Sequence, residues 1–223
     1  MQAQTLYKKS DYDFAAAAKK IGLAKSDLER DGQIERMLRT GVSSALPVKL
    51  KSEDGRTQLE TTARLALGSD PGGKPQIKIV LRANKLKLDR YRGINIDEES
   101  QKKLKDGENV LLEDKGGREY VARVDKDLNR VAGWRKSSIM VPNKLAVGGL
   151  GETKLRDEDM ASLKRGVAIE TQFGGAGFRA QIDPVRRELV LTRSLIKAKK
   201  VAAAPLVTEV VGARRKPSMG VRL

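Results

Sequence analysis

An internal repeat constrains the fold of this 223-residue chain more than any other feature. The first copy begins IDEESQKKLKDG at Ile96, and the second begins LRDEDMASLKRG at Leu155, 59 positions later. After a one-residue gap, YVARVD ending at Asp125 matches FRAQID ending at Asp183. Each copy predicts a short helix with an acidic first turn, a glycine that ends the helix, and three short strands.

The repeat divides the chain into four regions, and the expected fold class is α+β. The regions are a basic N-terminal α+β domain (1–92), two tandem helix-plus-three-strand units (93–145 and 146–195) and a flexible basic tail (196–223). The tail lacks a sustained hydrophobic period, which is typical of a segment that does not pack. The glycines between Gly148 and Gly151 are interpreted as a linker between the two units.

Local patterns in the N-terminal region predict helices followed by strands. The Ala-rich stretch 12–20 favours a helix that ends near Gly22. Ser26 with Glu29 predicts the capped start of a second helix, which continues to about Arg39. Alternating apolar residues predict strands over 46–50, 59–67 and 77–81, with a hairpin turn at 53–56.

The composition excludes several classes of function. The chain has no cysteine and no histidine, so it has no thiolate or imidazole for catalysis or metal binding. No apolar run is long enough for a membrane span, and no leader pattern opens the sequence. These observations predict a non-enzymatic protein without a cofactor, metal or membrane partner. We expect it in the bacterial cytoplasm, or inside a phage particle under the assembly alternative below.

Two motifs that resemble catalytic sites are explained by local structure. Gly68 to Lys74 spells the first seven positions of a phosphate-binding P-loop, but Pro75 stands where that loop needs a serine or threonine hydroxyl. Strands are predicted on both sides, which indicates a hairpin. The acidic runs 97–99 and 157–159 both fall in the first turn of a predicted helix, where the helix dipole favours negative charge.

The net charge of +16 is concentrated in two regions. Residues 1–92 carry +8 and residues 196–223 carry +6, whereas each repeat unit carries only +1. Localised positive charge is typical of a protein that binds a polyanion. We therefore expect nucleic acid, with DNA the expected type, as the partner. The near-neutral repeat units would instead dock other proteins.

The candidate contact residues lie in a basic stretch after the third strand and in the tail. Tyr91 stands between two arginines, a setting that suits stacking on a base, and Trp134 is a weaker candidate of the same kind. The predicted nucleic-acid-binding set is Arg82, Lys85, Lys87, Arg90, Tyr91, Arg92, Lys197, Lys199, Lys200, Arg214, Arg215 and Lys216. The alternative is a structural protein of a virion, secretion complex or conjugation complex, with these regions against acidic protein surfaces.

Three stretches carry a resemblance to a known family. The run GLAKSDLERDGQIERML from Gly22, followed by LPVKL and ETTARLAL, resembles a domain of unknown function from conjugative-element proteins of Bacteroidetes-type bacteria. The repeat units resemble the small domain that follows it there, which also extends topoisomerases of the mobile element. The resemblance covers roughly residues 12–195. It implies an accessory role in DNA transfer or processing and no catalytic residue to carry over.

Overall fold

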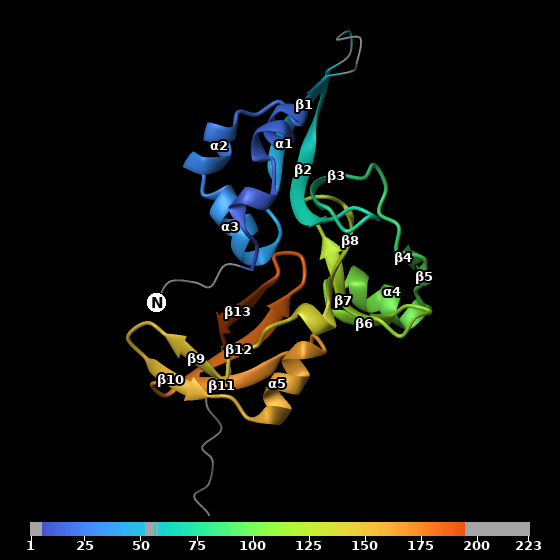
Figure 1. The fold of residues 1–223 in the computed structure, drawn as a ribbon. Helices are drawn as coiled ribbons and strands as arrows, with labels where there is room; N and C mark the ends of the chain where they lie inside the picture. Colours follow the sequence, from blue (N-terminus) through green and yellow to red (C-terminus); the bar gives the residue numbers. More distant parts are fainter. Residues whose placement is uncertain (1–5, 52–55, 57, 195–223) are drawn as a thin grey trace, which may run out of the picture.

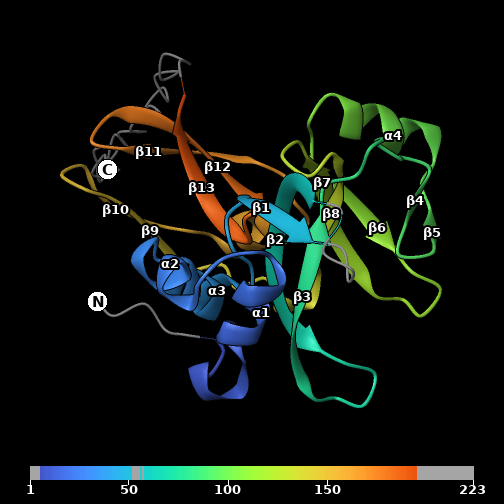
Figure 2. The ribbon, with the colours of Figure 1, turned by 90° about the horizontal axis from the view of Figure 1, so that it is seen from above.

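A computed structural model describes residues 6–51, 56 and 58–194 of the chain (Figures 1 and 2). The described residues form both helices and antiparallel strands, and the strands pair in several small sheets, which confirms the α+β class. The helices, including two short 3-10 turns, are η1 (Lys9–Asp11), α1 (Phe14–Lys20), α2 (Lys25–Arg30), α3 (Gln33–Thr40), α4 (Glu98–Lys105), η2 (Lys136–Ser138) and α5 (Asp157–Lys164). None of the helices in these described ranges is both long and apolar enough to cross a bilayer.

The N-terminal region packs three helices against a three-stranded antiparallel sheet. Its strands are β1 (Leu46–Lys51), β2 (Gln58–Ser69) and β3 (Pro75–Leu81), in the order β1-β2-β3. A core that includes Phe14, Ile21, Met37 and Leu65 fills the space between helices and sheet. Figure 1 shows the helices gathered on one side of these strands.

Two details of the helices differ from the sequence prediction. The second helix begins after Ala24, whose backbone N–H donates to the Asp27 carboxylate at 3.0 Å, so Ser26 is not the N-cap. The helix also does not run on to Arg39, because Gly32 adopts a left-handed φ of 64° and separates α2 from α3. Glycine takes this conformation without a Cβ penalty, and it turns the chain between the two helices.

Residues 98–135 form a helix and a three-stranded sheet. The strands are β6 (Val110–Glu113), β7 (Glu119–Asp125) and β8 (Arg130–Arg135), paired antiparallel in sequential order after α4. A small hairpin of β4 (Arg90–Tyr91) and β5 (Ile94–Asn95) precedes them. Leu88 and Tyr91 pack into the core of this sheet with Leu104 and Tyr120, so the stretch after β3 ties the two regions together.

Residues 157–193 show the same order of elements. Helix α5 is followed by β11 (Ile169–Phe173), β12 (Ala176–Asp183) and β13 (Glu188–Arg193), again antiparallel and sequential. The interpretation of the glycines between Gly148 and Gly151 as a linker is wrong in one respect. These residues form the turn of a two-stranded hairpin, between β9 (Lys144–Val147) and β10 (Gly151–Lys154). This hairpin packs Leu145 into the third core with Phe173 and Phe178.

The turns of the β7–β8 and β12–β13 hairpins both reach the N-terminal region (Figure 1). The β7–β8 turn touches the loop after β3, because the Ala83 backbone N–H donates to the Leu128 carbonyl at 2.8 Å. The β12–β13 turn touches α3, where Arg36 donates to the Arg186 carbonyl at 3.4 Å. The two turns therefore lie on either side of a space bounded by the N-terminal sheet.

Candidate nucleic-acid interface

A cleft of about 950 Å³ opens where the N-terminal sheet meets the two hairpin turns. Its walls come from β2, β3, the segment 83–92, the start of β8 and the β12–β13 turn. Eight lysines and arginines line it, against a single carboxylate, that of Asp125. Like charges that converge on one concavity attract a polyanion and raise its local concentration. The cleft is therefore the candidate site.

The structure brings five of the six predicted residues of the basic stretch into this cleft. Lys85, Lys87, Arg90, Tyr91 and Arg92 all line it. Among the described residues, no carboxylate forms an ion pair with any of these four basic side chains. Their charge is therefore available to a ligand.

Arg82 stands outside the cleft lining and is occupied elsewhere. Its guanidinium donates to the backbone carbonyls of Asp127 at 2.6 Å and Lys126 at 3.4 Å. These contacts join the end of β3 to the β7–β8 turn. The six predicted tail residues, Lys197, Lys199, Lys200, Arg214, Arg215 and Lys216, lie outside the described residues.

Tyr91 supports the cleft from within the core. Its side chain is only 9% exposed, and its hydroxyl donates to the Gly133 carbonyl at 3.3 Å. Burial raises the pKa of this hydroxyl, because desolvation disfavours the phenolate. The Tyr120 ring meets it edge-on, and the Arg92 guanidinium lies 5.7 Å from its ring centroid. Little of the ring is left for a base, and its placement favours a role in holding Arg92.

Four further basic residues of the cleft were missed by sequence reasoning. They are Arg64 on β2, Lys78 on β3, Arg130 at the start of β8 and Arg187 in the β12–β13 turn. Each comes from an alternating strand or a turn, where an isolated cation is an ordinary surface residue. Only the fold places them beside the basic stretch. The repeat offered one signal, since Arg187 falls 58 positions after Asn129 in the matching turn.

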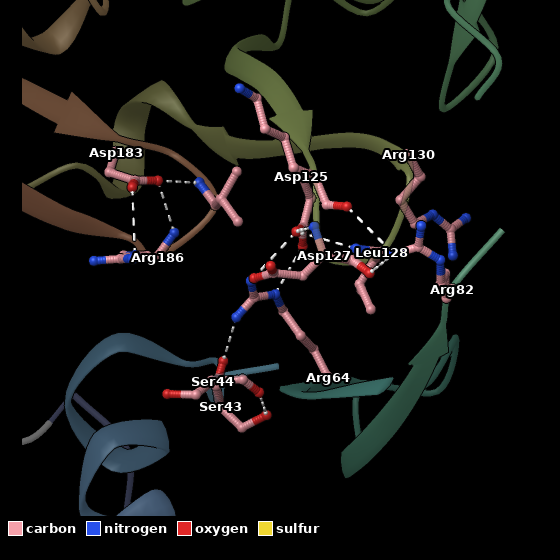
Figure 3. A network of polar contacts seen from close by, with 12 residues as sticks. Ser43, Ser44, Arg64, Arg82, Asp125, Asp127, Leu128, Arg130, Asp183 and Arg186 are labelled. Carbon is pink, nitrogen blue, oxygen red and sulfur yellow. Dashed lines mark hydrogen bonds and ion pairs between the residues drawn. The ribbon is translucent and has the colours of Figure 1, made fainter. Parts of the chain in front are cut away.

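Arg64 forms the buried ion pair that fixes one wall of the cleft (Figure 3). Its Nε lies 2.7 Å from Asp125 Oδ2, its Nη2 lies 2.9 Å from Asp127 Oδ2, and its Nη1 donates to the Ser43 carbonyl. The Arg64 and Asp125 side chains are 8% and 2% exposed. Asp125 also accepts from the backbone N–H groups of Asp127 and Leu128. All three guanidinium nitrogens are occupied, so Arg64 positions the turn rather than offering charge to a ligand.

The other motifs take structural places. The Gly68–Lys74 stretch spans the end of β2 and its turn into β3, where Lys74 donates its backbone N–H to the Asp70 carboxylate at 2.8 Å. Asp97 caps α4 through the backbone N–H of Ser100, and Asp159 lies in the first turn of α5. Trp134 is half-buried against the third core. No cluster of three carboxylates able to hold a metal ion occurs in the part of the chain described.

Comparison with known proteins identifies one region. A family model described as a protein of unknown function (DUF4099) matches residues 7–91. This span contains all three N-terminal helices, the β1–β3 sheet and most of the basic stretch. The match supports a domain of unknown function in that part of the chain. No curated protein and no solved structure matches the sequence.

Proposed function

We propose that the chain binds nucleic acid without strong sequence preference, through the basic cleft between the N-terminal sheet and the two hairpin turns. The observation that carries the proposal is the excess of eight basic side chains over one acidic side chain around a single cavity. Arg64 is neutralised by its ion pairs, which leaves seven cations for phosphates. Contacts of this kind supply affinity without reading sequence.

The size of the cleft favours one strand over a duplex as its occupant. Its volume of about 950 Å³ lies within the range that suits small ligands, so it would take a few nucleotides. Single-strand sites combine a positive groove with aromatic platforms, but here the nearby tyrosines are buried. We therefore propose that backbone phosphates, more than stacked bases, make the contacts.

The proposed setting is a bacterial mobile element, with the protein in the cytoplasm as an accessory to DNA transfer or processing. The support is the family match over residues 7–91, together with the resemblance of the same region to conjugative-element proteins. Residues 98–135 and 157–193 share an order of helix and strands, which supports the proposal that they are two copies of one unit. No catalytic step is proposed.

The direct test is the salt dependence of binding by the full-length protein. A fluorescent 20-nucleotide single strand and the corresponding duplex are titrated at several salt concentrations, by anisotropy. The triple variant Lys85→Ala, Lys87→Ala, Arg90→Ala should flatten the slope of log K against log salt by about 2 units on the single strand, since each phosphate contact contributes about 0.7.

The matched control removes three exposed lysines that do not line the cleft, Lys20, Lys102 and Lys115, by replacement with Ala. It changes the net charge equally and should leave the slope unchanged. Equal slopes for the cleft variant, the control and the wild type would contradict the proposal. If the wild-type protein does not bind nucleic acid at low salt but copurifies with an acidic protein, the result would favour the assembly alternative.

A further inference from the structure

Arg187 is an unusual cation within the cleft. It has a left-handed backbone with φ of 55° and a half-buried side chain. Its guanidinium nitrogen lies 2.6 Å from the place that a Cβ on Gly41 would occupy, and the Tyr7 hydroxyl lies 2.9 Å from the same point. Within the described residues no carboxylate forms an ion pair with it. The chain therefore places a partly desolvated positive charge here without a negative partner.

The backbone conformation of Arg187 is a second unfavourable feature of this residue. A left-handed conformation is strained for an L residue, because its Cβ crowds the following carbonyl oxygen, and Asn tolerates it better than most other non-glycine residues. The matching turn of the β7–β8 hairpin has Asn129 at this position, with φ of 51°. An arginine in the second turn thus has neither the backbone preference nor an ion pair, and its side chain hydrogen-bonds to the neutral Tyr7 hydroxyl instead. Strain of this kind, observed at a particular residue, points to a function.

Arg92 lines the same cleft, close enough to Arg187 for the two charges to interact. It stands in the two-residue turn between β4 and β5 with φ of 49°, so two of the three non-glycine residues with left-handed backbones in the described ranges are arginines that line one cleft. Its guanidinium is held over the rings of Tyr91 and Tyr120, at 5.7 and 5.5 Å from their centroids. Burial, chiefly, and the nearby charge of Arg92 both lower the pKa of Arg187.

We propose that Arg92 and Arg187 together bind one phosphoryl group inside the cleft. Two guanidinium groups present a set of N–H donors that matches phosphate oxygens in bidentate geometry. A bound dianion or phosphodiester would supply the negative charge that the protein withholds from both arginines. The inference rests on the proposed function for the source of the phosphoryl group, which is an internal backbone phosphate or a terminal phosphate of the strand.

The variant that tests this site is Arg187→Asn, which copies the residue of the matching turn. It removes the cation and suits the left-handed backbone. We expect the melting temperature of the ligand-free protein to rise by roughly 2–4 °C, because the variant relieves the backbone strain and removes the desolvated charge. Binding of the single strand should weaken by about tenfold, the effect of losing a charged hydrogen bond, and the salt slope should fall by about 0.7.

Arg186→Asn is the matched control. Arg186 is the exposed neighbour of Arg187 and lies outside the cleft lining, and its substitution removes the same charge. It should lower affinity by less than about twofold and leave the salt slope unchanged, because it loses only a distant, screened charge. If Arg187→Asn instead lowers the melting temperature and binds as tightly as the wild type, the arginine has a structural role and the proposal is overturned.

Further probes identify the source of the phosphoryl group. A 5′-phosphorylated strand that binds tenfold tighter than its unphosphorylated twin, with the gain lost in Arg187→Asn, assigns the site to a terminal phosphate. Equal binding of the two strands, with the same loss in the variant, assigns it to the backbone. Poly-glutamate that competes as well as the oligonucleotide at equal charge would overturn the proposal of a phosphoryl site.

A final measurement separates this inference from the proposed function. Inorganic pyrophosphate is added to the wild type and to Arg187→Asn, and the melting temperature is measured. Stabilisation of the wild type alone, without any binding of oligonucleotide, would refute the nucleic-acid proposal and retain the phosphoryl site. Binding of oligonucleotide with no effect of either Arg187→Asn or pyrophosphate would retain the nucleic-acid proposal and refute the site.

Discussion

The two hairpin turns, residues 125–130 and 183–188, share a hydrogen-bond pattern and a left-handed residue but have different partners. In each, an aspartate accepts from the N–H groups two and three residues later, and the residue before the next strand has a left-handed φ. The closing pairs of the ladders also correspond, Asp125 with Arg130 and Asp183 with Glu188. Local sequence therefore sets the turn, while the outward-facing side chains decide what each turn binds.

Those side chains give the turns opposite roles at the N-terminal region. The first turn offers carboxylates, and Asp125 receives Arg64 in a buried pair. The second turn offers one carboxylate, Glu188, to Arg36 at 3.1 Å and Arg39 at 3.4 Å on α3, and leaves Arg187 toward the cleft. Asp183 keeps only a 3.8 Å contact with Arg186 of its own turn. The first turn is held by a buried ion pair, and the second presents a cation that no carboxylate of the described residues pairs.

The largest loss of stability should follow from breaking the buried ion pair of Arg64 with Asp125. Arg64→Met leaves Asp125 buried without its partner, which should lower the free energy of unfolding by about 3–5 kcal/mol. Arg186→Met breaks the more exposed pair of the other turn and should cost less than about 1 kcal/mol. Urea denaturation measures both. Adding Asp125→Asn to Arg64→Met should recover part of the loss, and equal costs in the two turns would contradict the comparison.

Two glycines at helix ends separate backbone strain from crowding at Arg187. Gly41→Ala places a methyl group against the Arg187 guanidinium and the Tyr7 hydroxyl, at a φ of 80°. Gly32→Ala has a similar φ of 64° but nothing within 4 Å of the new methyl group. Gly32→Ala should cost about 1 kcal/mol, for the backbone alone. Gly41→Ala should cost about 2 kcal/mol, because displacement of the side chains adds to the same backbone penalty.

Oligonucleotide binding by the same two variants gives an independent reading. Displacement of Arg187 in Gly41→Ala should also weaken binding, whereas Gly32→Ala should bind normally. Anisotropy titrations at one salt concentration are sufficient. Identical stability and affinity in the two variants would show that the space beside Gly41 does not hold Arg187 in place.

The contact of the second turn with α3 should stabilise the fold less than the buried Arg64–Asp125 ion pair does. Glu188→Gln removes the carboxylate that Arg36 and Arg39 share, and the side chains involved are partly exposed. We expect a loss of about 1 kcal/mol in the free energy of unfolding. The loss should shrink in 1 M salt, because exposed ion pairs are screened, whereas that of Arg64→Met should persist. A cost above that of Arg64→Met would reverse the assignment of roles.

The smallest expected effect concerns the starts of α4 and α5. Hydrogen bonds from Ser100 lower the pKa of the Asp97 carboxyl, and the Arg156 side chain is the main cause that lowers the pKa of Asp159. Because both folded pKa values are depressed, each carboxylate stabilises the fold above its unfolded pKa, and this contribution is lost as pH falls through the folded pKa. In 1 M salt, carboxyl NMR titration should show the pKa of Asp159 rising more than that of Asp97. Equal shifts would contradict these different causes.

The sequence predicts local structure better than it predicts the site. Alternation of apolar residues located β1 and β3, and acidic first turns located α4 and α5, because these signals act within a few residues. The break at Gly32 was missed because the helical spacing of Leu28, Ile34 and Leu38 continues across it, although the pair Asp31-Gly32 is a local turn signal. The β9–β10 hairpin was missed because a Gly-rich turn resembles a linker until its strands pair.

The sequence indicates only half of the basic residues that line the cleft. Lys85, Lys87, Arg90 and Arg92 are close together in the chain, so their shared charge is visible there. Arg64, Arg130 and Arg187 come from three separate segments and meet only through tertiary contacts. The ion pair of Arg64 with Asp125 joins positions 61 residues apart, and no periodicity reports such a contact.

The central claim is that nucleic acid occupies the cleft between the two turns, and photocrosslinking tests it most directly. A 4-thiothymidine single strand is bound to the full-length protein at low salt, irradiated, and the crosslinked peptides are identified by mass spectrometry. The account predicts crosslinks within residues 78–92 and at the β12–β13 turn, reduced in Lys85→Ala, Lys87→Ala, Arg90→Ala. Crosslinks confined to residues outside the cleft, unchanged in that variant, would contradict it.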